Sequence, residues 1–150
     1  MQPKAKNSFL VGAVLCLLTA LLVFFQGYQY GQWEQNFYLP MVKRLLNPEY
    51  LTRDWFLNLP LYHTNILYLL GWLSKLIGLP WASFTFFSGS CFLYIVATYL
   101  IIREIWLDRF TALFGTYLLA LVIPFGLGGY ALLPTYFVPS LLGAVLVLWS

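Results

Sequence analysis

Long apolar runs that contain almost no charge constrain the fold of this chain most strongly. They lie at residues 8–25, 81–106, 110–125 and 135–150. Of the 150 residues, 61% are hydrophobic and 9% are charged, whereas about 25% of the residues in an ordinary soluble domain are charged. A water-soluble fold of this size cannot hide so much apolar surface, so we expect the chain to be dissolved in lipid.

Lipid restricts the architecture further. Backbone groups in hydrocarbon must pair with one another, which admits only α-helices and closed β-barrels. The runs lack the alternation of apolar and polar residues that barrel strands require. We therefore predict an all-α, polytopic integral membrane protein, with about four transmembrane helices and two interfacial helices in its first external loop. Residues 1–150 would form a single transmembrane helical domain.

The predicted spans are 8–25, 81–103, 110–125 and 135–150, with an external loop at 26–80. Two lysines precede the first span and place the amino terminus in the cytoplasm, so that the loop lies on the external or periplasmic side of the cell membrane. Because no small-residue cleavage site follows this span, we interpret it as an uncleaved helix rather than a signal peptide. The chain ends inside its last apolar run, which suggests the amino-terminal part of a longer protein.

The segment 64–78 has two interpretations. It is apolar, but about 15 residues of helix measure only about 22 Å, which is short of the roughly 30 Å hydrocarbon core. If it lies on the membrane surface, Arg103 and Arg109 fall in the cytoplasm, as the positive-inside rule prefers. The alternative is a short second span with a snorkelling Lys75. Helical spacing places the segment's polar and small residues on one face, namely Thr64, Tyr68, Gly71, Lys75 and Gly78.

A short amphipathic helix is predicted at 36–46, either bent or begun at Pro40 and stopped by Asn47 and Pro48. Its polar side carries Asn36, Lys43 and Arg44. Its apolar side is expected to rest on the membrane and consists of Phe37, Tyr38, Met41, Val42, Leu45 and Leu46.

The external loop also holds the best candidates for chemistry. Glu34 stands near the membrane edge, where a carboxylate can act as a general base or bind a divalent cation. The amides of Gln35 and Asn36 suit sugar hydroxyls. The alternative is that this wet, aromatic loop serves only to anchor the protein at the interface. No cofactor can be named, although a divalent metal ion is one candidate.

Four further polar side chains have open roles. Lys43 and Arg44 either meet a lipid phosphate or form the solvated side of a helix. Asp54 either stands beside Glu34 in a cleft or pairs locally on the surface. His63 is a ligand, a proton carrier or an interfacial aromatic residue.

Two classes of partner are not indicated. The basic residues are scattered and form no cluster of the kind that binds nucleic acid. Cys16 and Cys91 lie inside apolar runs, outside any Cys-x-x-Cys pattern that would hold a metal. The expected partner is the lipid bilayer itself.

Two motifs carry a resemblance to a known family. They are Trp33-Glu34-Gln35-Asn36-Phe37-Tyr38-Leu39-Pro40 and Leu73-Ser74-Lys75-Leu76-Ile77-Gly78. Their order after a first span resembles the amino-terminal region of the GT-C membrane glycosyltransferases, such as the protein mannosyltransferases and the lipid-linked aminoarabinose transferase. Many members have two acidic residues in this loop, whereas here Glu34 stands alone and the next acid is Glu49.

The resemblance implies transfer of a sugar from a polyprenyl-phosphate donor on the external face of the membrane. It assigns the catalytic carboxylate to Glu34 and leaves Gln35, Asn36, Lys43, Arg44, Asp54 and His63 as the candidate substrate-binding residues. The rival interpretation is a non-enzymatic membrane protein, either a transporter or flippase subunit or a scaffold. Transporters usually carry ionisable residues at mid-membrane, and the predicted spans carry none.

Overall fold

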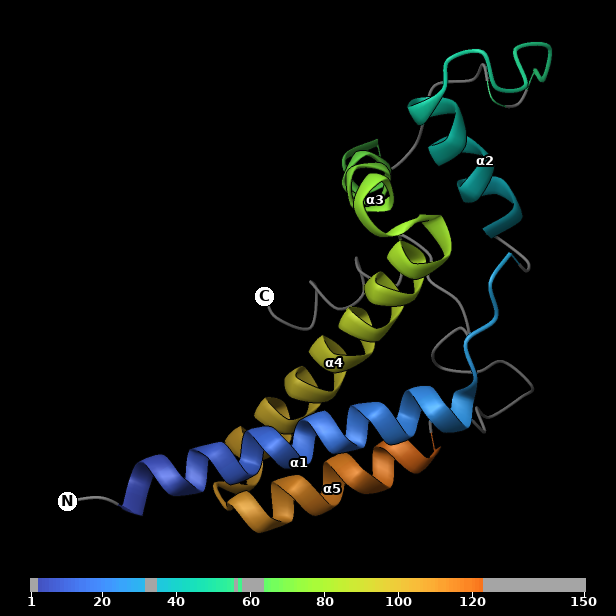
Figure 1. The fold of residues 1–150 in the computed structure, drawn as a ribbon. Helices are drawn as coiled ribbons and strands as arrows, with labels where there is room; N and C mark the ends of the chain where they lie inside the picture. Colours follow the sequence, from blue (N-terminus) through green and yellow to red (C-terminus); the bar gives the residue numbers. More distant parts are fainter. Residues whose placement is uncertain (1–2, 32–34, 56, 58–63, 123–150) are drawn as a thin grey trace.

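The computed structural model describes residues 3–31, 35–55, 57 and 64–122, and all regular structure in that part of the chain is helical. Figure 1 shows the five helices: α1 (Pro3–Gln26), α2 (Gln35–Leu46), α3 (Thr64–Ile77), α4 (Leu79–Trp106) and α5 (Arg109–Val122). The prediction of an all-α fold is therefore confirmed. The predicted span 135–150 lies outside the described residues, as do the predicted site residues Glu34 and His63.

Helix α4 connects the two ends of the molecule (Figure 1). It packs against α1, α3 and α5, while α2 packs on α3. The ring of Tyr28, just beyond α1, contacts the rings of Phe84 and Phe87 near the start of α4. Helix α1 therefore ends where α4 begins, and the two helices are antiparallel.

A single glycine separates α3 from α4. Gly78 has a φ of 83°, a left-handed conformation that residues with a Cβ rarely adopt. Its N–H still bonds to the Ser74 carbonyl at 2.9 Å, and its own carbonyl accepts the N–H of Ala82 at 2.9 Å. Pro80 occupies the first turn of α4, where its missing N–H costs no helical hydrogen bond. The chain thus turns from one helix into the next without a loop.

Two residues, Leu107 and Asp108, connect α4 to α5. Leu107 has a left-handed φ of 56°, and its N–H bonds to the Arg103 carbonyl at 2.8 Å. Asp108 then caps α5, because its Oδ2 accepts both the N–H and the hydroxyl of Thr111 at 2.7 Å. A Cβ on Gly115 would lie 3.2 Å from Ile102 Cδ1, so this glycine marks a close approach of α4 and α5.

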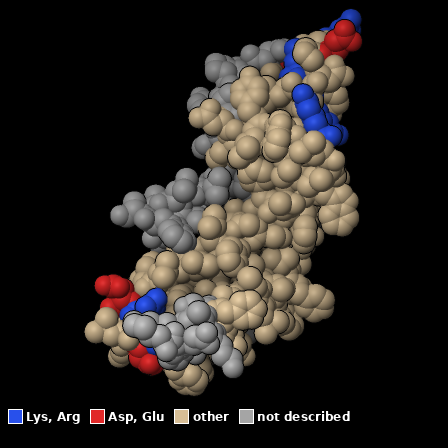
Figure 2. All heavy atoms as spheres, turned by 60° about the vertical axis from the view of Figure 1, so that its left-hand side comes forward, with Lys and Arg blue, Asp and Glu red and all other residues tan. Residues whose placement is uncertain are grey.

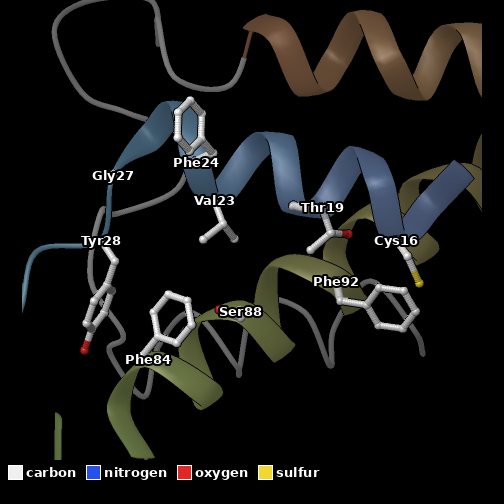
Figure 3. A pocket seen from close by; sticks show the side chains of 10 residues that line it. Cys16, Thr19, Val23, Phe24, Gly27, Tyr28, Phe84, Ser88 and Phe92 are labelled. Atoms are coloured by element: carbon white, nitrogen blue, oxygen red, sulfur yellow. The ribbon is translucent and has the colours of Figure 1, made fainter. Parts of the chain in front are cut away.

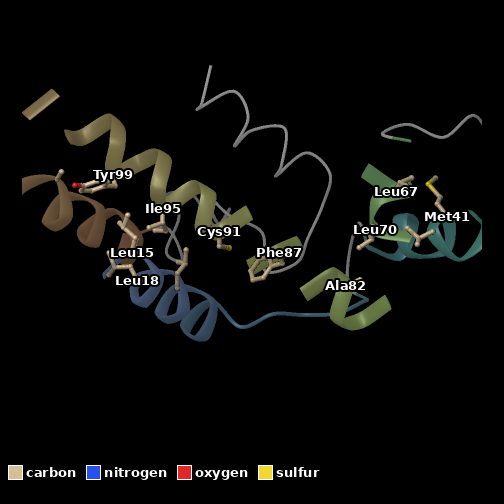
Figure 4. Packing of buried hydrophobic residues seen from close by; sticks show 14 of the residues in the cluster. Leu15, Leu18, Met41, Leu67, Leu70, Ala82, Phe87, Cys91, Ile95 and Tyr99 are labelled. Carbon is tan, nitrogen blue, oxygen red and sulfur yellow. The ribbon is translucent and has the colours of Figure 1, made fainter. Parts of the chain in front are cut away.

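The buried apolar residues follow α4 from one end to the other (Figure 4). Phe87, Cys91 and Ile95 of α4 meet Leu15 and Leu18 of α1 in the long part of the molecule. At the other end, Leu67 and Leu70 of α3 lie beside Met41 of α2. The second group exists because two amphipathic helices bury their apolar sides against each other.

This packing corrects the expectation for α2. Its apolar side was expected to rest on the membrane, but Met41 and Val42 are buried, and the side chain of Val42 faces Gly71 of α3. Phe37 is exposed instead. The alternative of a helix that begins at Pro40 is also wrong, because α2 begins at Gln35 and continues through the proline. Sequence periodicity finds an apolar face but does not identify what covers it.

The residues on the predicted polar face of α3 differ in exposure. Tyr68 and Lys75 are exposed, but Gly71 is buried against the side chains of Val42 and Leu46. A glycine in this position lets α2 come close to α3. The segment is one helix of 14 residues, about 21 Å long.

Among the described residues, only α4 is long and apolar enough to cross a membrane. Shorter apolar stretches lie at Phe9–Phe25 and Asn65–Ile77. Figure 2 shows the charged side chains of the visible face at the two ends of the molecule, with an uncharged surface between them. No Lys, Arg, Asp or Glu occurs from residue 76 to residue 102.

Candidate functional site

A buried amide stands at the junction of α1, α2 and α4. Gln35 is the first residue of α2 and is only 1% exposed. Its Oε1 accepts the Gly31 N–H at 2.7 Å, and its Nε2 donates to the Tyr28 hydroxyl at 3.3 Å. Buried amides are rarely left without partners, and this one connects the segment after α1 to the beginning of α2.

Tyr28, the partner of the Gln35 amide, also contacts α4. Its ring lies edge-on to Phe84, with centroids 5.4 Å apart, and tilted against Phe87 at 5.2 Å. Burial raises the pKa of the Tyr28 hydroxyl, while Gln35 and the nearby Ser83 hydroxyl act in the opposite direction. Ser83 Oγ lies near Tyr28 without forming a full hydrogen bond, so it is a buried hydroxyl with no partner in the described chain. The junction is polar and closely packed.

An open groove of about 700 Å³ runs from this junction along α1 and α4 (Figure 3). Tyr28 and Phe84 line one end, and Cys16 and Phe92 line the other. The wall carries no charged residue, and the lining residues with hydroxyl groups are Thr19, Tyr28 and Ser88. The hydroxyl of Thr19 is bonded to the Leu15 carbonyl at 2.9 Å, whereas that of Ser88 is buried without a partner in the described chain. The chemistry of the wall suits a hydrocarbon chain.

The two predicted amide side chains lie in different environments. Glu34, predicted as the catalytic carboxylate, lies outside the described residues. Gln35 is buried and hydrogen-bonded within the chain, whereas its neighbour Asn36 is exposed. Only Asn36 presents its amide to the surface.

The two predicted cations of α2 both lie near Tyr50. Lys43 is exposed, with its ammonium 5.7 Å from the centre of the Tyr50 ring. Arg44 donates from Nη1 to the Tyr50 carbonyl at 2.9 Å, which ties the following turn to the end of α2. Asp54 is exposed in that turn, where its N–H bonds to the Leu51 carbonyl at 3.0 Å. His63 lies outside the described residues.

Within the described ranges, no group of three or more His, Cys, Asp or Glu side chains could hold a metal ion. Cys16 and Cys91 are both free, the first exposed and the second buried. The described chain therefore contributes hydrogen-bonding and apolar groups to this region.

Sequence reasoning missed the parts of the junction that α4 supplies. Ser83, Phe84 and Ser88 lie inside an apolar run, and nothing in that run singles them out. The sequence gives a weak indication that Gln35 is buried. Gln35 stands one helical turn before the buried Leu39 and so falls on the same face of α2.

No protein-family model, no curated protein and no solved structure matches this chain.

Proposed function

We propose that this chain is a multi-pass membrane protein of the cell membrane that acts as a GT-C-type glycosyltransferase, transferring a sugar from a polyprenyl-phosphate donor on the external face. One observation carries the proposal. Two short helices, α2 and α3, pack on each other at the end of the molecule where α1 ends and α4 begins. In the sequence, α2 follows directly on Glu34, the carboxylate predicted to be catalytic.

The antiparallel course of α1 and α4 supports the topology. If α3 crossed the membrane, α4 would run in the same direction as α1. The opposite directions of α1 and α4 therefore support a surface position for α3. The spans of the proposal are α1, α4, α5 and the apolar run at 135–150. The uncharged part of α4, residues 79–102, measures about 36 Å as helix and is long enough to cross.

In the proposed reaction, Glu34 takes the proton of an acceptor hydroxyl, which attacks the anomeric carbon of the sugar as the bond to the lipid phosphate breaks. Asn36 and Lys43, both exposed on α2, are the described candidates for binding the substrate. The apolar groove beside the junction offers room for hydrocarbon.

Activity tests the catalytic role. The full-length protein in vesicles, supplied with a polyprenyl-phosphate sugar and an acceptor, should lose about 10²- to 10⁴-fold in transfer rate with Glu34→Gln. The matched control is Glu49→Gln, the same chemical change in an exposed turn. Transfer by Glu34→Gln at the wild-type rate would remove Glu34 from the mechanism.

Cysteine labelling tests the topology separately. In a variant with Cys16 and Cys91 replaced, a membrane-impermeant maleimide on intact cells should modify Asp54→Cys and Lys75→Cys. It should reach Glu104→Cys only after the cells are permeabilised. Labelling of Lys75→Cys only after permeabilisation would place α3 across the membrane.

A second candidate is a non-enzymatic scaffold. Gln35 and Arg44, two of the expected substrate-binding residues, use hydrogen bonds to hold the chain together. If the wild-type protein folds in vesicles with the predicted labelling pattern and transfers no sugar, this candidate replaces the enzyme.

A further inference from the structure

Helix α3 has two unlike sides. Leu67, Leu70 and Ser74 are buried on the side that faces α2 and α4. Tyr68, Trp72 and Leu76, spaced four residues apart on the other side, are exposed. They form a stripe of apolar and aromatic side chains along the helix.

A second exposed tryptophan follows shortly after the turn at Gly78. Trp72 is 61% exposed near the end of α3, and Trp81 is 66% exposed in the first turn of α4. Only Gly78 stands between the two helices. We call the segment from Trp72 to Trp81, which carries Lys75 and turns at Gly78, the α3–α4 elbow. Tryptophan rings are enriched where hydrocarbon meets the lipid headgroups.

Lys75 gives the elbow its charge. It is exposed, and it stands three residues after Trp72, so the two side chains are neighbours on the helix surface. In the described ranges 35–55 and 64–81, four side chains are basic and two, Glu49 and Asp54, are acidic. Arg44 is bonded to the Tyr50 carbonyl, and Lys43 lies over the Tyr50 ring. Lys75, by contrast, lies among exposed aromatic and apolar groups.

We propose that the α3–α4 elbow binds the phosphate of an anionic glycerophospholipid in the external leaflet. The two tryptophans lie at the depth of the glycerol backbone, and the Lys75 ammonium contacts the phosphate above them. The apolar stripe of α3 rests on the acyl chains. This inference depends on the proposed membrane placement and does not depend on sugar transfer.

The test compares lipids that remain bound to the full chain. Wild type and variants are reconstituted in nanodiscs that contain equal amounts of phosphatidylglycerol and phosphatidylcholine, and native mass spectrometry counts the lipids retained. Removal of one lysine near the surface should lower the preference for phosphatidylglycerol about fivefold, so we expect this decrease for Lys75→Gln. Lys75→Arg should keep the wild-type preference.

Arg53→Gln is the matched control, since it removes an exposed cation from the turn after α2. It should leave the preference unchanged. A wild-type preference in Lys75→Gln, or an equal loss in Lys75→Arg, would overturn the inference. Displacement of phosphatidylglycerol by added inorganic phosphate would identify free phosphate as the ligand and overturn it too. Failure of the wild-type protein to enter nanodiscs would overturn the membrane placement as well.

Discussion

The Gln35 side chain accepts a hydrogen bond from the Gly31 N–H at 2.7 Å, so a buried amide fixes the way the chain enters α2. Gly31 has a φ of 75°, a conformation that favours glycine. The bond links two residues four positions apart, and the other end of the amide reaches back to Tyr28. Local geometry and the packing of α1 on α4 are therefore coupled through one side chain.

Gln35→Leu should lower the free energy of unfolding by about 1–3 kcal/mol, because the Gly31 N–H is left without a partner. The measurement is denaturant unfolding in mixed micelles followed by circular dichroism. Asn36→Leu is the control, since it makes a similar change on the exposed neighbour. Equal stability of the two variants would show that the buried amide contributes nothing.

Gly115→Leu should lower the free energy of unfolding by about 1–3 kcal/mol, because even a Cβ at this position lies 3.2 Å from Ile102 Cδ1. Adding Ile102→Ala should recover part of the loss, which a double-mutant cycle detects. Gly89→Leu is the matched control, since a Cβ there meets nothing within 4 Å. A larger loss from Gly89→Leu than from Gly115→Leu would contradict the close approach of α4 and α5.

Leu107→Gly should raise the free energy of unfolding by about 0.5–1 kcal/mol, because it relieves a left-handed conformation at a residue whose side chain is 83% exposed. Leu107→Ala retains a Cβ and should bring no gain. Thermal unfolding of both variants in one detergent measures the difference. Destabilisation by the glycine would mean that the Leu107 side chain makes a stabilising contact.

Asp108 should make stability depend on pH at the acid end. The Thr111 N–H, and after it the Thr111 hydroxyl, hold the pKa of Asp108 below its ordinary value of 3.8. Because the pKa is lower in the folded state, the cap stabilises fully above pH 3.8 and its contribution is lost as the pH falls through the folded pKa. The difference in melting temperature between wild type and Asp108→Asn should shrink over that range. Glu104→Gln is the control, because it leaves both bonds from Thr111 to Asp108 in place. The difference in melting temperature between wild type and Glu104→Gln should stay the same over that pH range.

Helix positions could be predicted because apolar periodicity is local. The helix expected at 36–46 is α2 at Gln35–Leu46, and the segment expected at 64–78 is α3 at Thr64–Ile77. Each of these predictions needs only neighbours within one helix.

The burial of α2 against α3 could not be predicted, because it depends on two segments that are separate in sequence. The same limit applies to Gln35: its polarity suggested a substrate ligand, but Tyr28 and Gly31 satisfy its amide. The groove between α1 and α4 needs the antiparallel pairing of those helices before it exists. Sequence periodicity identifies which side of a helix is apolar, and tertiary structure decides what that side touches.

The one-residue connection at Gly78 has a mechanical consequence for the proposed membrane placement. Helix α4 has 28 residues and measures about 42 Å, which exceeds a roughly 30 Å hydrocarbon core. If α3 lies on the membrane surface, as proposed, the depth of α3 sets the depth at which α4 enters the lipid, because only Gly78 separates the two helices. A change in bilayer thickness is then taken up as tilt of α4, with α3 as the pivot.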